Sequence, residues 1–126
     1  MIAYKKPLMV LVDEMSASGA DSFPATIQDN QRGPLFWWRT MGAGGSVEGR
    51  WAGSYSQGYT TVTQSLMSRN QDVVTPDFPV TRYVENVGVR PDIEFDYMTR
   101  ENLRRDGGVF VDAFLFAMYN HIQSGK

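Results

Sequence analysis

The chain has 126 residues, of which 42% are apolar and 21% charged, the composition of one ordinary globular domain or of part of one. Its 12 basic and 14 acidic residues give a net charge of −2 without a basic run, so neither nucleic acid nor an anionic membrane is an expected partner. The sequence has no cysteine, no histidine pair and no phosphate-binding glycine loop, which excludes disulfides and thiol catalysis and predicts no metal or cofactor.

The first expected elements are a strand and a helix joined by small residues. The apolar run at residues 8–12 follows Pro7 and predicts a buried strand. The secure part of the next helix is expected at residues 22–31, where Pro24 is tolerated in the first turn. A second short strand is expected at residues 35–39, with its two tryptophans on opposite faces and one of them buried.

The middle of the chain is rich in glycine and β-forming residues. Residues 42–58 predict a loop or a pair of glycine-broken strands. Residues 60–66 and 81–84 are β-rich and are expected to pair or to flank one sheet edge. The intervening residues 69–79 contain two prolines, which predicts a loop between these two β-rich segments.

Two helices are expected at the end of the chain. Thr99 is a plausible N-cap for a short helix that ends at residues 107–108, and residues 109–123 predict a longer helix. The longer helix repeats large apolar residues every four positions, which indicates a face packed in the core rather than a cofactor site. These residues are Phe110, Phe114, Met118 and Ile122.

The corner between the first strand and the first helix carries the most chemistry. A serine at this corner, Ser18, would expose its hydroxyl while the amides of Gly19 and Ala20 point outward from the helix start. Nucleophile and oxyanion donors would then come from one turn, as acyl transfer requires. The alternative is that Ser16 or Ser18 only caps the helix, because serine is a preferred N-cap residue.

Four ordered blocks of the sequence resemble the tail-specific and C-terminal processing serine peptidases, a family that includes tricorn protease and interphotoreceptor retinoid-binding protein. The blocks are an apolar strand followed by Ser-Ala-Ser, Gln28-Asp29, Arg39-Thr40-Met41-Gly42, and the Gly-Val-x-Pro-Asp segment at residues 88–92. The resemblance implies a crotonase-like α/β fold, with helices packed on a mixed sheet. It also implies that Ser18 is the nucleophile, with Gly19 in the oxyanion hole.

The base that such a serine needs is not evident in this chain. In the serine-lysine branch the lysine lies in a Thr-Phe-Gly-Lys-Gly block, and Ala43 occupies that position here. An alanine cannot accept a proton, so the chain resembles instead the tricorn-like branch, which uses an upstream histidine and a downstream glutamate. His121 is the single histidine and is expected at the surface or helix end rather than as the base. Residues 1–126 are therefore expected to be the C-terminal part of a catalytic domain whose upstream half holds the histidine and another oxyanion turn.

Two acidic residues are candidates for supporting roles. Asp21 matches a glutamate of the serine-lysine members and could orient the base or a substrate amine, although an acidic residue also suits a helix N-terminus for electrostatic reasons alone. Glu85 is expected, by resemblance, to support the histidine, with a structural role in its turn as the alternative. Arg39, Thr40 and Gly42 are expected at the rim of the site, in contact with substrate.

The sequence thus predicts a serine endopeptidase that forms an acyl-enzyme on Ser18 with a peptide or protein substrate and that is inactive without its upstream half. The alternative is a non-catalytic ligand- or peptide-binding module on the same fold. A third possibility is acyl-coenzyme A chemistry, which does not require the Ser-Ala-Ser block. The exposed sheet edge of such a fragment is expected to pair with a second copy. The resemblance implies a periplasmic or extracytoplasmic location.

Overall fold

The structure is a computed structural model and describes residues 4–125. Three parallel strands form its central sheet in the order β1-β2-β7, made of Val10–Val12, Leu35–Trp37 and Ile93–Glu94. The helix α1 (Gly19–Asp29) connects β1 to β2. The strands expected at residues 8–12 and 35–39 and the first helix are therefore confirmed, with shorter strands and an earlier helix start.

Consecutive residues of β2 point to opposite faces of this sheet. Leu35 is fully buried in a cluster with Val12, Ala25, Val84 and Val89, on the side of α1. Phe36 is 1% exposed and belongs to the aromatic cluster on the other side. That cluster is formed by Phe36, Trp37, Phe95, Tyr97, Phe110 and Phe114, with ring centroids 4.8–5.9 Å apart.

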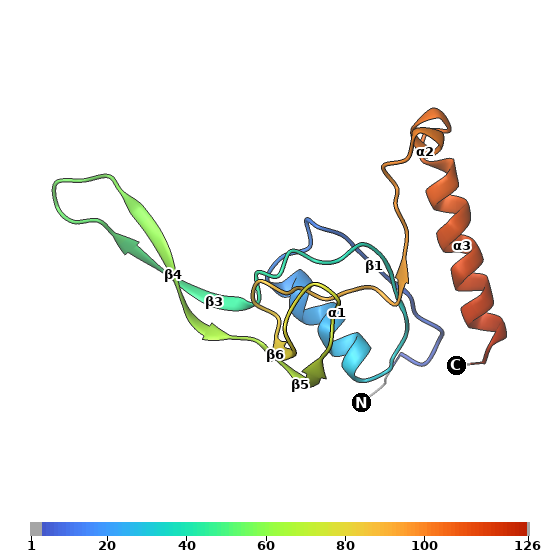
Figure 1. The fold of residues 1–126 in the computed structure, drawn as a ribbon, viewed down its shortest axis with the longest axis horizontal. Coiled ribbons are helices and arrows are strands. Elements are labelled where there is room, and N and C mark those ends of the chain that lie inside the picture. The colour runs from blue at the N-terminus through green and yellow to red at the C-terminus, as the bar shows by residue number, and fades with distance from the viewer. Residues whose placement is uncertain (1–3, 126) are drawn as a thin grey trace.

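Two antiparallel strand pairs complete the β-structure. The hairpin of β3 (Gly45–Trp51) and β4 (Tyr59–Leu66) extends away from α1, on the side opposite to the C-terminal helix (Figure 1). The second pair joins β5 (Ser68–Val73) to β6 (Thr81–Tyr83). Parallel and antiparallel pairing thus occur in three separate sheets rather than in one mixed sheet.

This arrangement corrects two expectations about the middle of the chain. The β-rich residues 60–66 and 81–84 do not share a sheet edge, because β4 pairs with β3 and β6 pairs with β5. Part of the loop expected at residues 69–79 is the strand β5. Its polar sequence shows no alternation, and it is held by contacts with β6 and α1 that lie far away in the sequence.

The two terminal helices begin where the sequence predicts. In α2 (Arg100–Arg104) the Thr99 side chain caps the helix by accepting a hydrogen bond from the Asn102 N–H at 3.2 Å. The longer helix α3 (Gly108–Gln123) lies along the side of the molecule opposite to the hairpin (Figure 1). No residue of α3 is buried, and Ile122 is 49% exposed. The predicted core face is therefore only partly correct: Phe110 packs in the aromatic cluster, but the C-terminal half of the stripe is open.

The tryptophan pair behaves similarly. Trp37 is half-buried against Tyr97 and Phe110, whereas Trp38 is 42% exposed. The expectation that one of the two is buried is met only in part.

A buried ion pair fastens β5 to the end of α1. The Arg69 guanidinium donates to the Asp29 carboxylate at 2.5 Å and to Gln28 Oε1 at 2.9 Å, and both charged side chains are 5% exposed. Burial by itself raises the pKa of Asp29, but the hydrogen bonds from Arg69 and the Asn70 N–H, with the charge of Arg69, outweigh it and hold the pKa below its usual value. The stability that Asp29 contributes is therefore present above about pH 4 and is lost as the pH falls through the lowered native pKa.

Arg69→Ala is expected to destabilise the protein by about 3–5 kcal/mol, because it leaves a buried carboxylate without its partner. Urea unfolding of the two proteins measures the difference. The matched control is Arg82→Ala, which breaks an exposed pair with Asp72 and is expected to cost about 1 kcal/mol or less. Equal losses in the two variants would contradict the structural role given to Arg69.

Candidate active site

The turn between β1 and α1 is built from local hydrogen bonds of its small and acidic residues. Ser16 Oγ donates to Asp13 Oδ1 at 2.8 Å, and the Ser16 N–H donates to the Asp13 carbonyl at 3.0 Å. The carbonyl of Ser16 accepts the Met41 N–H at 2.9 Å, which anchors the turn to the segment after β2. This bonding fixes Ser18 directly before the first helical residue, Gly19.

Ser18 itself has an unusual backbone conformation. Its φ is 56° and its ψ is −110°, and its side chain is exposed. Positive φ is uncommon for a residue other than glycine and costs on the order of 1–3 kcal/mol. An ordinary N-cap residue has an extended backbone, so helix capping alone does not account for this conformation.

The amides around Ser18 leave one donor free. Within residues 4–125 the Gly19 N–H makes no hydrogen bond, as expected at the start of a helix. The Ala20 N–H, in contrast, donates to the Ala17 carbonyl at 2.9 Å, and the Ser18 N–H donates to Asp21. The expectation that Gly19 and Ala20 both point their amides outward is therefore corrected, because Ala20 is already bonded.

A cavity of about 400 Å³ opens beside this turn. Its lining is small, polar or apolar, and none of its lining residues is charged: Ser18, Gly19, Ser22, Gly44, Gly45, Ser46, Ser65, Leu66 and Met67. The cavity lies between the N-terminus of α1 and the base of the β3–β4 hairpin. A peptide could therefore reach the Ser18 hydroxyl and the Gly19 N–H from one space.

Glu85 lies next to Gly45, which lines this cavity, but it is not itself among the lining residues. It follows the buried residue Val84, and a side chain at Gly45 would begin 3.2 Å from Glu85 Oε2. The turn after it is tight: Asn86 has a φ of 61°, and its N–H donates to the Gly42 carbonyl at 2.7 Å. Ser18 therefore opens onto the cavity, and Glu85, 67 residues later in sequence, lies behind its lining at Gly45.

The predicted rim residues have partners within the protein. Thr40 is 1% exposed; its hydroxyl donates to Asp21 and accepts from the Val89 N–H at 2.7 Å. Arg39 donates to the Val87 carbonyl at 2.7 Å and lies over the Phe78 ring. Thr40 could contact a substrate only by leaving these partners, whereas Arg39 is half-buried and donates to Val87 through Nη1 alone.

Asp21 was expected near a base or a substrate amine, and its surroundings differ from both. Its side chain is fully buried, and its four hydrogen-bond donors are Ser18 N–H, Thr40 Oγ1–H, Gly42 N–H and Ala43 N–H. The local sequence could not show this, because residues 40–43 meet α1 only in the folded chain.

The Gly-Val-x-Pro-Asp segment shapes the backbone and joins elements of the fold. Gly88 has a φ of 71°, which glycine adopts readily. Asp92 accepts the Leu35 N–H at 2.7 Å and the Gln28 side chain at 3.0 Å, and it thereby joins β2 to the C-terminal end of α1.

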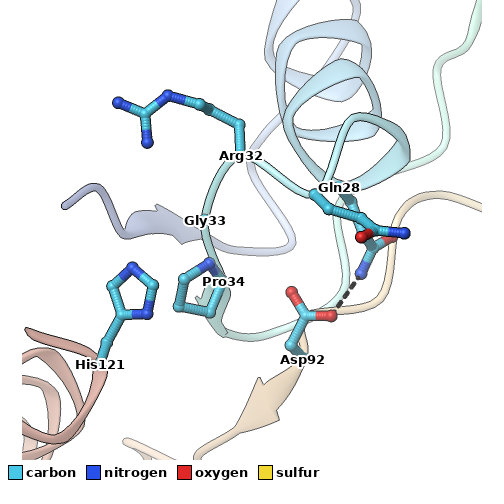
Figure 2. A pocket seen from close by; sticks show the side chains of 7 residues that line it. Gln28, Arg32, Gly33, Pro34, Asp92 and His121 are labelled. Carbon is cyan, nitrogen blue, oxygen red and sulfur yellow. Dashed lines mark hydrogen bonds between the residues drawn. The ribbon is translucent and has the colours of Figure 1, made fainter. Parts of the chain in front are cut away.

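His121 lies away from the serine. It lines a different cavity, of about 290 Å³, together with Gln28, Arg32 and Asp92 (Figure 2). Gln28 is ten residues after Ser18 on α1, a distance of about 15 Å along the helix. The structure therefore does not bring the single histidine to the candidate nucleophile.

Other kinds of site were sought in the same residues. Residues 4–125 contain no group of three or more potential metal-binding side chains. None of the helices formed by these residues is long and apolar enough to cross a membrane.

Comparisons with known proteins give consistent results. A family model described as peptidase family S41 matches residues 1–95. A protein of Chlamydia trachomatis serovar D is 32% identical and an uncharacterized protein of Chlamydia muridarum is 35% identical, each over 107 residues. Both alignments cover 84% of this chain but 16% of the relative, so the chain spans about a sixth of the length of these relatives.

A solved structure of mature CPAF complexed with lactacystin is also similar. The TM-score is 0.82 at 29% identity, over 98% of this chain and 22% of that chain. The arrangement of helices and strands described above is thus also found in a protein of related sequence whose structure has been solved.

Proposed function

The chain belongs to peptidase family S41, and from this premise we propose that it is the nucleophile-bearing part of a serine endopeptidase, with Ser18 as the nucleophile. The observation that carries the proposal is the conformation of Ser18. A strained serine at a strand-to-helix corner, next to a free Gly19 N–H and an open cavity, is the arrangement that acyl transfer needs.

The proposed reaction has two stages. Ser18 Oγ attacks the peptide carbonyl carbon and gives its proton to a base, while the Gly19 N–H donates a hydrogen bond to the developing oxyanion. The base then protonates the leaving amine, and the C–N bond breaks to leave an ester on Ser18. A water molecule, deprotonated by the same base, hydrolyses the ester and regenerates the serine.

We propose that the base is a histidine from an upstream part of the same polypeptide. Three observations support this: among residues 4–125 no lysine or histidine lines the Ser18 cavity, Ala43 stands at the lysine position of the serine-lysine branch, and His121 lies near the opposite end of α1. Glu85 would hold that histidine in the correct orientation, and the upstream part would complete the oxyanion hole. We also propose that the complete domain, with its upstream part, has the crotonase-like architecture.

A fluorophosphonate probe is expected to label Ser18 in the full-length protein but not in the 126-residue chain alone, because the chain lacks the base that activates the hydroxyl. Mass spectrometry of the labelled protein measures both outcomes. Stoichiometric labelling of the isolated chain would show that residues 1–126 already contain a base, and the proposed upstream histidine would then be wrong.

One observation favours the alternative, a non-catalytic binding module. The β3–β4 hairpin exposes aromatic side chains that could hold a ligand or peptide; Trp51 is 73% exposed and Tyr55 fully exposed. The two functions differ in a simple assay. A binding module would retain a peptide without cleaving it, and Ser18→Ala would leave its affinity unchanged.

A further inference from the structure

A single carboxylate joins the three segments that form the candidate active site. Asp21 lies in the first turn of α1, and its side chain has no exposed surface. We propose that Asp21 is a positioning residue of the reaction: it holds Ser18 in its strained conformation and keeps it in register with the turn that carries Glu85. The inference rests on the proposed function and assigns Asp21 a role different from the one expected from the sequence.

The hydrogen bonds of Asp21 leave no place for another partner. Oδ1 accepts from Thr40 Oγ1 at 2.5 Å and from the Gly42 N–H at 3.0 Å. Oδ2 accepts from the Ser18 N–H at 2.9 Å and from the Ala43 N–H at 3.0 Å. An ionised carboxylate offers about four acceptor positions, and all four are used. Asp21 therefore acts through the backbone and not by contact with a base or a substrate amine.

The bond to the Ser18 N–H explains how a costly conformation persists. A non-glycine residue keeps a positive φ only when its surroundings over-determine it. On one side of Ser18 the N–H is bonded to Asp21; on the other, the Ser18 carbonyl accepts from the N–H groups of Asp21 and Ser22 at 2.9 and 3.0 Å. The peptide groups on both sides of the nucleophile are thus fixed, and one side depends on the carboxylate.

The same carboxylate connects Ser18 to Glu85. Gly42 donates its N–H to Asp21 and accepts, at its carbonyl, the N–H of Asn86, which directly follows Glu85. Thr40 makes a parallel connection, because its hydroxyl bonds to both Asp21 and the Val89 N–H. Three hydrogen bonds therefore connect the Ser18 N–H, through Asp21 and Gly42, to the turn that carries Glu85.

Asp29, at the other end of α1, provides a matched control. Its side chain is also buried, at 5% exposed, and it also accepts a backbone N–H, that of Asn70 at 3.0 Å. It differs from Asp21 in having no bond to the nucleophile or to residues 40–43. A role of Asp21 in stability alone would make Asp21→Asn and Asp29→Asn behave alike.

In the full-length protein, Asp21→Asn is expected to lower kcat per folded molecule by about 100-fold, with KM within about threefold of the wild type, because it displaces the nucleophile by a fraction of an ångström to an ångström. Asparagine keeps one acceptor oxygen, and its NH₂ group faces either the N–H groups of Ser18 and Ala43 or the N–H of Gly42 and the hydroxyl of Thr40, so at least one backbone donor loses its acceptor. Asp29→Asn is expected to lower the melting temperature and leave kcat unchanged. Thr40→Val, which removes one of the four donors, serves if Asp21→Asn does not fold, and is expected to lower kcat by about tenfold.

The conformation of Ser18 gives a readout that does not depend on activity. A crystal structure of the Asp21→Asn protein is expected to show Ser18 with negative φ, and Asp29→Asn to show it unchanged. Unchanged φ in the Asp21→Asn protein, or equal kcat for the Asp21 and Asp29 variants, overturns the positioning role. An inactive wild type would instead count against the proposed function, and the φ of Ser18 would still decide the role of Asp21.

Discussion

Replacing Ser18 with alanine in the full-length protein is expected to lower kcat by about 10⁵-fold or more, the loss typical of a serine nucleophile. Alanine has no atom that can form the acyl-enzyme. The fold is expected to be unaffected, because the side chain is exposed and a lost cap would cost only about 1 kcal/mol. Peptide turnover and thermal unfolding of the same preparation measure the two quantities.

Two further variants separate the hydroxyl from the backbone strain. Ser18→Gly is expected to be as inactive as Ser18→Ala but more stable by about 1 kcal/mol, since glycine adopts positive φ without strain. Ser54→Ala, which removes an exposed hydroxyl from the turn of the β3–β4 hairpin, is expected to retain turnover. A Ser18→Ala protein that cleaves peptide at the wild-type rate would end the serine-peptidase proposal and favour the binding module.

Replacing Glu85 with glutamine is expected to lower kcat by about 10³–10⁴-fold with a much smaller change in KM, as for a carboxylate that orients a catalytic histidine. The substitution keeps the shape of the side chain and removes its charge next to Gly45, a residue that lines the Ser18 cavity. Steady-state kinetics on a single peptide substrate measures both constants.

Glu48→Gln is the control for this charge change. Glu48 is an exposed glutamate on the hairpin, 53% exposed and paired with Arg50, and its loss is expected to leave kcat unchanged. A Glu85→Gln protein with normal kcat would assign Glu85 to its turn, the alternative reading of this residue. A change in KM alone would point to a substrate contact.

The sequence predicts those parts of the fold that depend on local preferences. The apolar run before Ser18, the Thr99 cap and the glycines at residues 107–108 each act on their immediate neighbours, and the corresponding elements are present. The strand β5 was missed because its sequence is polar and its stability comes from Arg69 and from β6. Periodicity in α3 shows which face is apolar but not how much of that face is covered.

The same distinction applies to the candidate site. Ser18 and Gly19 belong to one turn, so their relation can be inferred from adjacent residues. The candidate role of Glu85 follows from the resemblance to a known family, and the fold places it next to Gly45, a residue of the cavity lining. Three of the four donors to Asp21 lie 19 to 22 residues away, and no local pattern predicts that they converge on it. The positive φ of Ser18 is likewise not evident from the sequence around it.

The close contact between Gly42 and Gly88 determines which parts of the site can move. A side chain at Gly42 would begin 2.8 Å from the Gly88 nitrogen, so the two turns lie backbone against backbone with no room for either to rotate alone. Two turns packed in this way are expected to move together rather than separately. Residues 46–66 of the hairpin, in contrast, are exposed throughout and adjoin the cavity at Ser46 and Leu66. Movement beside the cavity is therefore expected in this exposed arm rather than in the two packed turns.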